Sequence, residues 1–450
     1  MPAPSAVLEG ARPALALIVL DGLSDRPNPS TGGVTPVEAA LTPHLDSLLR
    51  VGAIGELIVV GEGIAPESDA GVFALLGYDP VRDSPGRGIL EAVGVGLPLA
   101  PEDIALRMNF ATVDGDGTVI DSRVGRSLST SEATQLATRL TAADLLAPEG
   151  IRAEVRATVG HRGVLWLHPT RDGALSPEIS NADPFYEKVG GMGKARRPER
   201  ATLERVAALD DSPEARRSAE AVNRFLERSS ASLAGDPVNA RRALSGRKLA
   251  NAILARNAGK LPAEPPPSFA SRYGLEGAAL TEMPVERGIA RILRLEDRYV
   301  GPMGSDRDAG YRERARLARD LLTHFPFVYV HLKGPDEPGH DGDALGKKSA
   351  VEAIDRSFFG PFLDGLDLAR TRLAVTADHA TPSDLKSHSA DPVPLLLAGN
   401  GISAKLPDAA SKFGEAAAAR GALGRRRGAD VVPLLLRPPS LLASHSTTGE

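Results

Sequence analysis

The 450-residue sequence contains no cysteine, and this absence excludes several kinds of chemistry. Disulfide bonds, thiolate metal sites and cysteine nucleophiles all need a thiol, so any bound metal must be held by oxygen and nitrogen atoms. Near the start, the longest purely apolar run is Ala14–Leu20, whereas a membrane helix needs about 20 residues. The first residues also lack the basic segment and long apolar core of a signal peptide. We therefore expect a cytoplasmic protein with no membrane partner.

An excess of positive charge is missing as well. The formal net charge is −5, and the chain has an ordinary globular composition with 42% hydrophobic and 25% charged residues. Nucleic acid is not an expected partner, because binding a polyanion requires a basic surface. The length is sufficient for two domains. The residues leave the oligomeric state open.

Short apolar runs predict the strands of a buried sheet, because their length and β-branched content favour strands over helices. Helical patterns lie between them, at residues 216–233, 307–325 and 346–366. This alternation predicts an α/β fold with a doubly wound, mostly parallel sheet. The runs are LALIVL (15–20), ELIVV (56–60), FVYVHL (327–332), RLAVTA (372–377) and VPLLLA (393–398).

The middle of the chain has a less regular pattern with more single charges. We therefore predict that residues 100–246 form a smaller inserted α+β domain, and that residues 1–99 and 247–450 form the core domain. The proline-rich segment 260–269 is predicted to be a connector without a helix.

Three of the predicted strands are followed by a carboxylate, and two of these also by a histidine. In open α/β sheets, ligands bind just beyond the carboxyl ends of the strands. One aspartate after one strand is explained equally well by a turn or a helix cap, but three such loops together predict a metal site. Oxygen and imidazole ligands suit Mn²⁺, Mg²⁺ or Zn²⁺. The side chains are Asp21, Asp336, His340, Asp378, His379 and, in a following loop, His388.

Ser68 lies in the polar segment PESD, which leads into an apolar helical stretch. Its hydroxyl has two interpretations: it caps the helix, or it is a nucleophile facing a substrate at the positive end of the helix. The serine by itself does not decide between them.

Several longer motifs carry a family resemblance. They include DGLSDRP, EGIAPESDAGVFALLGYDP, GRGILEAVG, HLKGPDEPGHDGD and VTADHATPSDLKSHSADPVPLLL. With them, the sequence resembles the archaeal-type, cofactor-independent (2,3-bisphosphoglycerate-independent) phosphoglycerate mutases of the alkaline phosphatase superfamily, from about residue 15 to residue 436. The resemblance implies an alkaline-phosphatase-like core with a lid domain. It also implies that 3-phosphoglycerate and 2-phosphoglycerate, small phosphorylated carboxylates of glycolysis and gluconeogenesis, are interconverted.

The resemblance also implies roles for the candidate residues. Ser68 would be the nucleophile that takes the phosphoryl group, and two divalent cations, Mn²⁺ or Mg²⁺ with Zn²⁺ as a further candidate, would assist it. Asp21, Asp378 and His379 would hold one cation, which also contacts Ser68. The second cation would be held by Asp336, His340 and His388.

A mutase lid should carry cationic side chains for the carboxylate and phosphate of its substrate, and arginine suits both through paired hydrogen bonds. For each arginine, an ordinary ion pair is an equally good explanation. Arg123 and Arg126 are favoured because they cluster with an acid in IDSRVGR. The candidates for substrate binding are Arg107, Arg123, Arg126, Arg162 and Lys333.

The sequence departs from the family pattern just after Ser68. Ala70 replaces the usual hydroxyl-bearing residue, and Val72 and Phe73 replace polar residues or histidine. These positions bear on substrate choice, so the alternative is a metal-dependent phosphatase or phosphomutase acting on a related phospho- or phosphono-carboxylate. A catalytically silent binding homologue is a third hypothesis, against which the complete ligand set argues.

Overall fold

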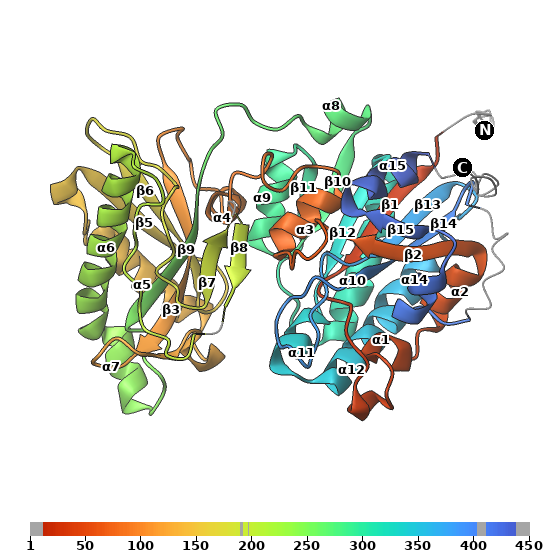
Figure 1. The fold of residues 1–450 in the computed structure, drawn as a ribbon, viewed down its shortest axis with the longest axis horizontal. Helices are drawn as coiled ribbons and strands as arrows, with labels where there is room; N and C mark the ends of the chain where they lie inside the picture. The colour runs from red at the N-terminus through yellow and green to blue at the C-terminus, as the bar shows by residue number, and fades with distance from the viewer. Residues whose placement is uncertain (1–11, 190–191, 197, 403–410, 438–450) are drawn as a thin grey trace, which may run out of the picture. The chain divides into compact units, whose positions relative to one another are not determined.

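The computed structural model describes residues 12–189, 192–196, 198–402 and 411–437. Their contacts divide the chain into two compact units (Figure 1). The core unit comprises Met1–Asp79, Ser268–Glu282 and Arg294–Glu450, and the inserted unit comprises Pro80–Pro267 and Met283–Leu293. Within the described residues, no helix is both long enough and apolar enough to cross a membrane.

The core unit contains an eight-stranded sheet with the order β11-β10-β12-β1-β13-β14-β2-β15. Strand β14 is antiparallel to both of its neighbours, and all other pairs are parallel, which confirms the predicted mostly parallel sheet. The central strands are buried along almost their whole length, as expected for continuous apolar runs covered on both faces. The strands are β1 (Ala14–Leu20), β2 (Gly52–Ile58), β10 (Gly277–Thr281), β11 (Glu296–Tyr299), β12 (Phe327–Leu332), β13 (Thr371–Thr376), β14 (Val393–Gly399) and β15 (Gly424–Arg427).

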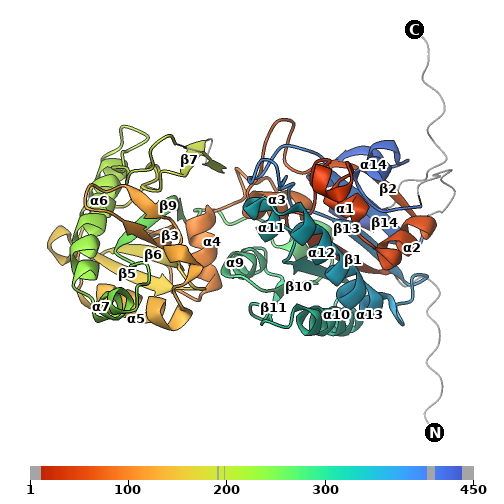
Figure 2. The same ribbon diagram turned by 90° about the horizontal axis from the view of Figure 1, so that it is seen from below.

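Helices cover this sheet (Figures 1 and 2). Helix α10 packs against β10, β12 and β1, α2 against β2 and β14, and α15 against β13. The helices of the core unit are α1 (Pro36–Ala39), α2 (Pro43–Val51), α3 (Ser68–Leu75), α8 (Phe269–Tyr273), α10 (Arg307–His324), α11 (Asp336–Asp341), α12 (Ala344–Ile354), α13 (Gly360–Leu363), α14 (Glu415–Arg420) and α15 (Val431–Leu436).

The helix predicted over residues 346–366 is interrupted. A π-helical turn, Asp355–Phe359, separates α12 from α13. The carboxylate of Asp355 accepts hydrogen bonds from the backbone N–H groups of Leu45 (2.8 Å) and His44 (3.2 Å) at the start of α2. The turn therefore provides acceptors for N–H groups that α2 itself leaves without helical partners.

The inserted unit is built on an antiparallel sheet with the order β4-β3-β6-β5, in which β9 also pairs with β3. Side chains of β3 alternate between two apolar clusters, one with α5 and α6 and one with α4, as the period of a strand requires. Its strands are β3 (Ile104–Val113), β4 (Val119–Asp121), β5 (Ile151–Ala157), β6 (Arg162–Pro169), β7 (Tyr186–Val189), β8 (Met192–Ala195) and β9 (Ala252–Lys260). Its helices are α4 (Arg87–Gly94), α5 (Thr130–Ala142), α6 (Pro213–Ala234), α7 (Pro237–Leu244) and α9 (Pro284–Ile292).

This unit extends beyond the predicted 100–246. Helix α4 packs against β3, β6 and β9, and β9 pairs with β3 along most of its length, so residues on both sides of the predicted boundaries belong to the insertion. One division lies between Pro267 and Ser268, at the end of the proline-rich connector. The boundary predicted at residue 246 therefore lies too early in the chain. The local sequence of β9 does not show that this strand pairs with β3 of the insertion.

Candidate active site

Three adjacent strands deliver carboxylates to one edge of the core sheet. In the order β12-β1-β13, Leu20 is level with Leu332 and Val19 with Thr376, so the carboxyl ends of these strands lie side by side. Asp21 follows β1 directly, Asp378 lies just beyond β13, and Asp336 begins α11 after β12. The sequence prediction that these three loops meet is therefore realised in the structure.

Two carboxylate oxygens at this edge lack hydrogen-bond donors. Asp21 Oδ1 and Asp378 Oδ2 are buried, and neither accepts a hydrogen bond within the described part of the chain. The other oxygen of Asp378 accepts the backbone N–H of Gly22 at 3.1 Å. Burying anionic oxygens is unfavourable unless a cation compensates them, so this pair fits a metal ion.

His379 and Ser68 complete a first group of ligand atoms. His379 Nε2 lies 3.4 Å from Asp21 Oδ1 and 3.4 Å from Asp378 Oδ2. The Ser68 hydroxyl lies 3.2 Å from the same nitrogen. With metal–ligand bonds of about 2.0–2.2 Å, ligand atoms lie about 3.0–3.5 Å from one another. The donor set and its spacing fit one divalent cation.

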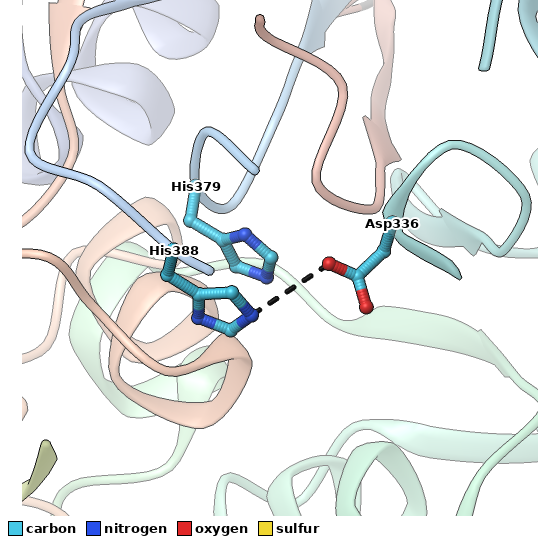
Figure 3. Close-up of side chains that lie close together, drawn as sticks. All are labelled: Asp336, His379 and His388. Carbon is cyan, nitrogen blue, oxygen red and sulfur yellow. Dashed lines mark ion pairs between the residues drawn. The ribbon is translucent and has the colours of Figure 1, made fainter. Parts of the chain in front are cut away.

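A second group surrounds Asp336. Its Oδ1 lies 3.5 Å from His340 Nε2 and 3.6 Å from His388 Nε2. The rings of His379 and His388 stack with centroids 3.7 Å apart, and Figure 3 shows both imidazoles facing the Asp336 carboxylate. The structure thus brings the six predicted carboxylate and imidazole ligands, together with the Ser68 hydroxyl, to one edge of the sheet.

The outer nitrogens of two histidines are held by the backbone. Nδ1 of His388 lies 2.8 Å from the carbonyl oxygen of Pro66, and Nδ1 of His340 lies 3.2 Å from that of Lys386. A carbonyl oxygen only accepts, so in each ring Nδ1 carries a hydrogen and Nε2 is the atom that faces Asp336 and would offer its lone pair to a bound cation. This arrangement is the usual one for a metal-ligating histidine.

Charge balance in the cluster shifts several pKa values. Burial raises the pKa of Asp21, but Lys333, His331 and His379 outweigh it and hold this pKa well below its usual range. Burial lowers the pKa of His388, but the hydrogen bond and charge of Asp336 outweigh it and raise this pKa to about 9. The buried carboxylates are thus stabilised by positive charge, and a bound divalent cation would supply this charge in place of protons on the histidines.

Ser68 is not the capping residue of its helix. It is the first residue of α3, whose N-cap is Glu67 and lacks a side-chain cap, and the Ser68 hydroxyl contacts His379 instead. Gly71 allows this close approach, because a Cβ atom there would lie 2.3 Å from the carbonyl oxygen of Asp378. The geometry argues against the capping interpretation, and the nucleophilic role stays a prediction.

Two further basic side chains contact the first group. His331 is buried near the end of β12, with Nε2 3.4 Å from Asp378 Oδ2 and 3.7 Å from Asp21 Oδ1. His331 is not among the ligands predicted from the sequence, although its place at the end of a strand that precedes a ligand loop was a usable signal. Lys333, predicted to bind substrate, lies with its Nζ 3.0 Å from Asp21 Oδ2.

Comparisons with known proteins identify the family of this chain. The family described as 2,3-bisphosphoglycerate-independent phosphoglycerate mutase matches residues 50–239. The mutase of that name from Aeropyrum pernix is 46% identical over 410 residues, covering 90% of this chain and 95% of that protein. The chain belongs to the 2,3-bisphosphoglycerate-independent phosphoglycerate mutase family. The resemblance inferred from its motifs is confirmed.

Other members of the family are similar over the same length. The mutase from Methanopyrus kandleri is 37% identical over 429 residues, covering 95% of this chain and 96% of that protein. A solved structure of the cofactor-independent phosphoglycerate mutase from Thermoplasma acidophilum matches with a TM-score of 0.59 and 31% identity, covering 94% of this chain and 99% of that one. A solved Pyrococcus horikoshii protein matches with a TM-score of 0.74 and 29% identity, covering 98% of this chain and 100% of that one.

The four arginines predicted to bind substrate lie in the inserted unit of this family member, close to one buried histidine. Burial and the surrounding positive charges lower the pKa of His161 to about 3. A buried neutral imidazole within a cationic group marks a region that favours an anion. The charges acting on His161 are those of Arg162, Arg123, Arg107 and Arg126.

The loop that carries Arg123 and Arg126 has an unusual backbone. Val124 and Arg126 both have a φ of 53°, in the left-handed region that β-branched and bulky residues rarely adopt. The loop is held by Asp121, which accepts the N–H of Arg123 at 2.8 Å and pairs with Lys248 at 2.5 Å, and by the buried side chain of Val124. Strain of this kind persists where surrounding contacts enforce it, often at functional sites.

Proposed function

We propose that this protein interconverts 3-phosphoglycerate and 2-phosphoglycerate through a phosphoserine at Ser68, assisted by two divalent cations. The observation that carries the proposal is the pair of buried carboxylate oxygens, Asp21 Oδ1 and Asp378 Oδ2, beside the serine hydroxyl and His379. Asp336, His340 and His388 would hold the second cation, and His379 lies between the two groups.

The reaction runs in two balanced halves. The Ser68 hydroxyl gives up its proton as its oxygen attacks the phosphorus atom, the bond from phosphorus to the glycerate oxygen breaks, and that oxygen takes up a proton. The neighbouring glycerate hydroxyl then attacks the phosphorus atom of phospho-Ser68 and loses its proton, the bond from phosphorus to the Ser68 oxygen breaks, and that oxygen takes up a proton, which restores the serine. When bound, divalent cations lower the pKa of a hydroxyl and neutralise phosphoryl charge. The N–H groups at the start of α3 favour an anion next to Ser68.

The arginines of the inserted unit would keep the glycerate bound after the first half-reaction and until the second takes place. Arginine binds carboxylate and phosphate through paired, charge-assisted hydrogen bonds. A mutase must keep its glycerate bound, because water that reaches phospho-Ser68 releases phosphate. Arg123 and Arg126, on their constrained loop, are the first candidates, with Arg107 and Arg162 beside them. Lys333 would balance the charge of Asp21.

Phosphorus NMR of the purified protein with Mn²⁺ and 3-phosphoglycerate tests the activity. We expect a 2-phosphoglycerate signal to appear without release of phosphate. Ser68→Ala should abolish turnover by several orders of magnitude, because covalent catalysis has no substitute group here. Ser349→Ala is a matched control on an exposed face of α12 and should keep the wild-type rate. Near-normal turnover in Ser68→Ala would contradict the phosphoserine mechanism.

The same spectra separate a mutase from the phosphatase alternative. The alternative arose from three positions that depart from the family pattern. All three are buried in the core unit, where their side chains serve packing: Ala70, Val72 and Phe73. In Arg123→Ala and Arg126→Ala we expect a higher ratio of released phosphate to 2-phosphoglycerate. A wild-type protein that releases only phosphate would replace the mutase proposal by the phosphatase.

A further inference from the structure

The hydroxyl of Thr381 touches a ligand from each of the two cation groups. It donates a hydrogen bond to Asp336 Oδ1 at 2.7 Å, and it lies 3.0 Å from Nδ1 of His379. Asp336 belongs to the second group, whereas His379 faces both: its Nε2 lies 3.4 Å from Asp21 Oδ1 and Asp378 Oδ2, and it also has a ligand atom within 4.8 Å of ligand atoms of Asp336 and His388. We infer that Thr381 is a positioning residue that couples the two cation sites, an inference that rests on the cation sites of the proposed function.

Hydrogen-bond chemistry determines the direction of both contacts. A carboxylate only accepts, so the single hydroxyl hydrogen of Thr381 goes to Asp336. The hydroxyl oxygen must then accept from His379, which places the imidazole hydrogen on Nδ1. The lone pair of His379 therefore lies on Nε2, the atom that faces Ser68, Asp21 and Asp378. One hydroxyl thus selects the tautomer of one ligand and orients the carboxylate of another.

The backbone around Thr381 is fixed from both sides. Its N–H donates to the carbonyl oxygen of Ser24 at 3.0 Å, and its own carbonyl oxygen accepts from Lys347 Nζ at 2.6 Å. Lys347 is fully buried and also donates to the carbonyl oxygen of Gly22 at 3.0 Å. The loops after β1 and β13 are therefore tied together beneath the cation ligands.

Space for the bridge depends on a glycine. A Cβ atom at Gly22 would lie 2.6 Å from the Thr381 hydroxyl oxygen and 2.7 Å from Asp336 Oδ1. Gly22 also has a φ of 59°, where a side chain is strained. The loop that carries Asp21 therefore needs a glycine at position 22, because the hydrogen bond between Thr381 and Asp336 lies directly against it. This close packing holds the Thr381 hydroxyl between the ligands of the two sites.

Calorimetric titration of Mn²⁺ into the metal-free full-length protein tests the coupling. We expect Thr381→Val, which keeps the side-chain shape but removes the hydroxyl, to weaken Mn²⁺ binding at both sites by about 10–100-fold. Thr381→Ser retains the hydroxyl and should stay within about threefold of wild type. Thr376→Val is the matched control, because Thr376 is equally buried but its hydroxyl donates to the carbonyl oxygen of Pro394 (2.8 Å).

A double-mutant cycle tests the link itself. Removing a second-site ligand by His340→Gln should weaken first-site binding in the wild-type background and have little further effect in Thr381→Val. Wild-type affinity in Thr381→Val, a loss at one site only, or equal losses in Thr381→Ser and Thr381→Val would each overturn the coupling while leaving the proposed function intact. A wild-type protein that binds no Mn²⁺ would overturn both.

Discussion

Because His161 is buried among the arginines of the inserted unit, the unfolding free energy should decrease as the pH falls. In the folded protein, burial and four arginine charges lower the pKa of His161 from 6.5 to about 3. Below about pH 6.5 the His161 imidazole therefore binds a proton in the unfolded chain but stays neutral in the folded chain until the pH approaches 3. The stability contributed by the neutral imidazole is fully present above that pH and is lost as the pH falls toward 3.

The size of the effect follows from the shift. At about 1.4 kcal/mol per pH unit, lowering the pH from 8 to 5 should remove about 2 kcal/mol of unfolding free energy through His161 alone. Urea unfolding of wild type and His161→Gln at both pH values measures it, because the variant lacks this dependence. His324→Gln, at an exposed position on α10, is the control and should retain the wild-type dependence.

Proton NMR of the His161 ring provides a direct check. Its pKa should lie far below that of an exposed histidine, and Arg126→Ala should raise it by removing one of the charges. Adding 3-phosphoglycerate should raise it too, because a bound anion compensates the arginines. A His161 ring that titrates near pH 6.5, or equal pH dependence in wild type and His161→Gln, would refute the interpretation of this cluster as a preformed anion site.

Three further predictions concern the core unit. Saturation with Mn²⁺ at 100 times its dissociation constant should stabilise the fold by about 2.7 kcal/mol per site, seen as a rise in Tm that EDTA reverses; an unchanged Tm would contradict two filled sites. Lys347→Met should cost about 3–5 kcal/mol in urea unfolding, because the buried carboxylate of Asp25, 3.0 Å from Lys347 Nζ, loses its charge partner and the carbonyl groups of Gly22 and Thr381 lose a buried donor. His331→Gln should weaken Mn²⁺ binding at the first site by about 10–100-fold, and Tyr329→Phe, which removes a hydroxyl 3.0 Å from His331 Nδ1, should have a smaller effect in the same titration.

Local pattern in the sequence determined the strands and the types of ligand. Four of the five apolar runs predicted as strands form β1, β12, β13 and β14, and the fifth, at 56–60, overlaps only the end of β2, since short β-branched segments bury well only in a covered sheet. Aspartate and histidine residues after three of these runs indicated a metal site, because strand ends form the ligand edge of such sheets. The family motifs added the pairing of Ser68 with that edge, which the residues alone left open.

Only the tertiary structure decided which of these segments meet. The strands β12, β1 and β13 are neighbours in the sheet, and this order brings Asp336, Asp21 and Asp378 together. The pairing of β9 with β3 extends the insertion past the predicted residue 246. His331 and Thr381 acquire their contacts in the same way, from neighbours distant in the sequence. The physical reason is that a strand's period and a loop's composition are local properties, whereas pairing, tautomer and hydrogen-bond direction depend on partners that folding selects across the whole chain.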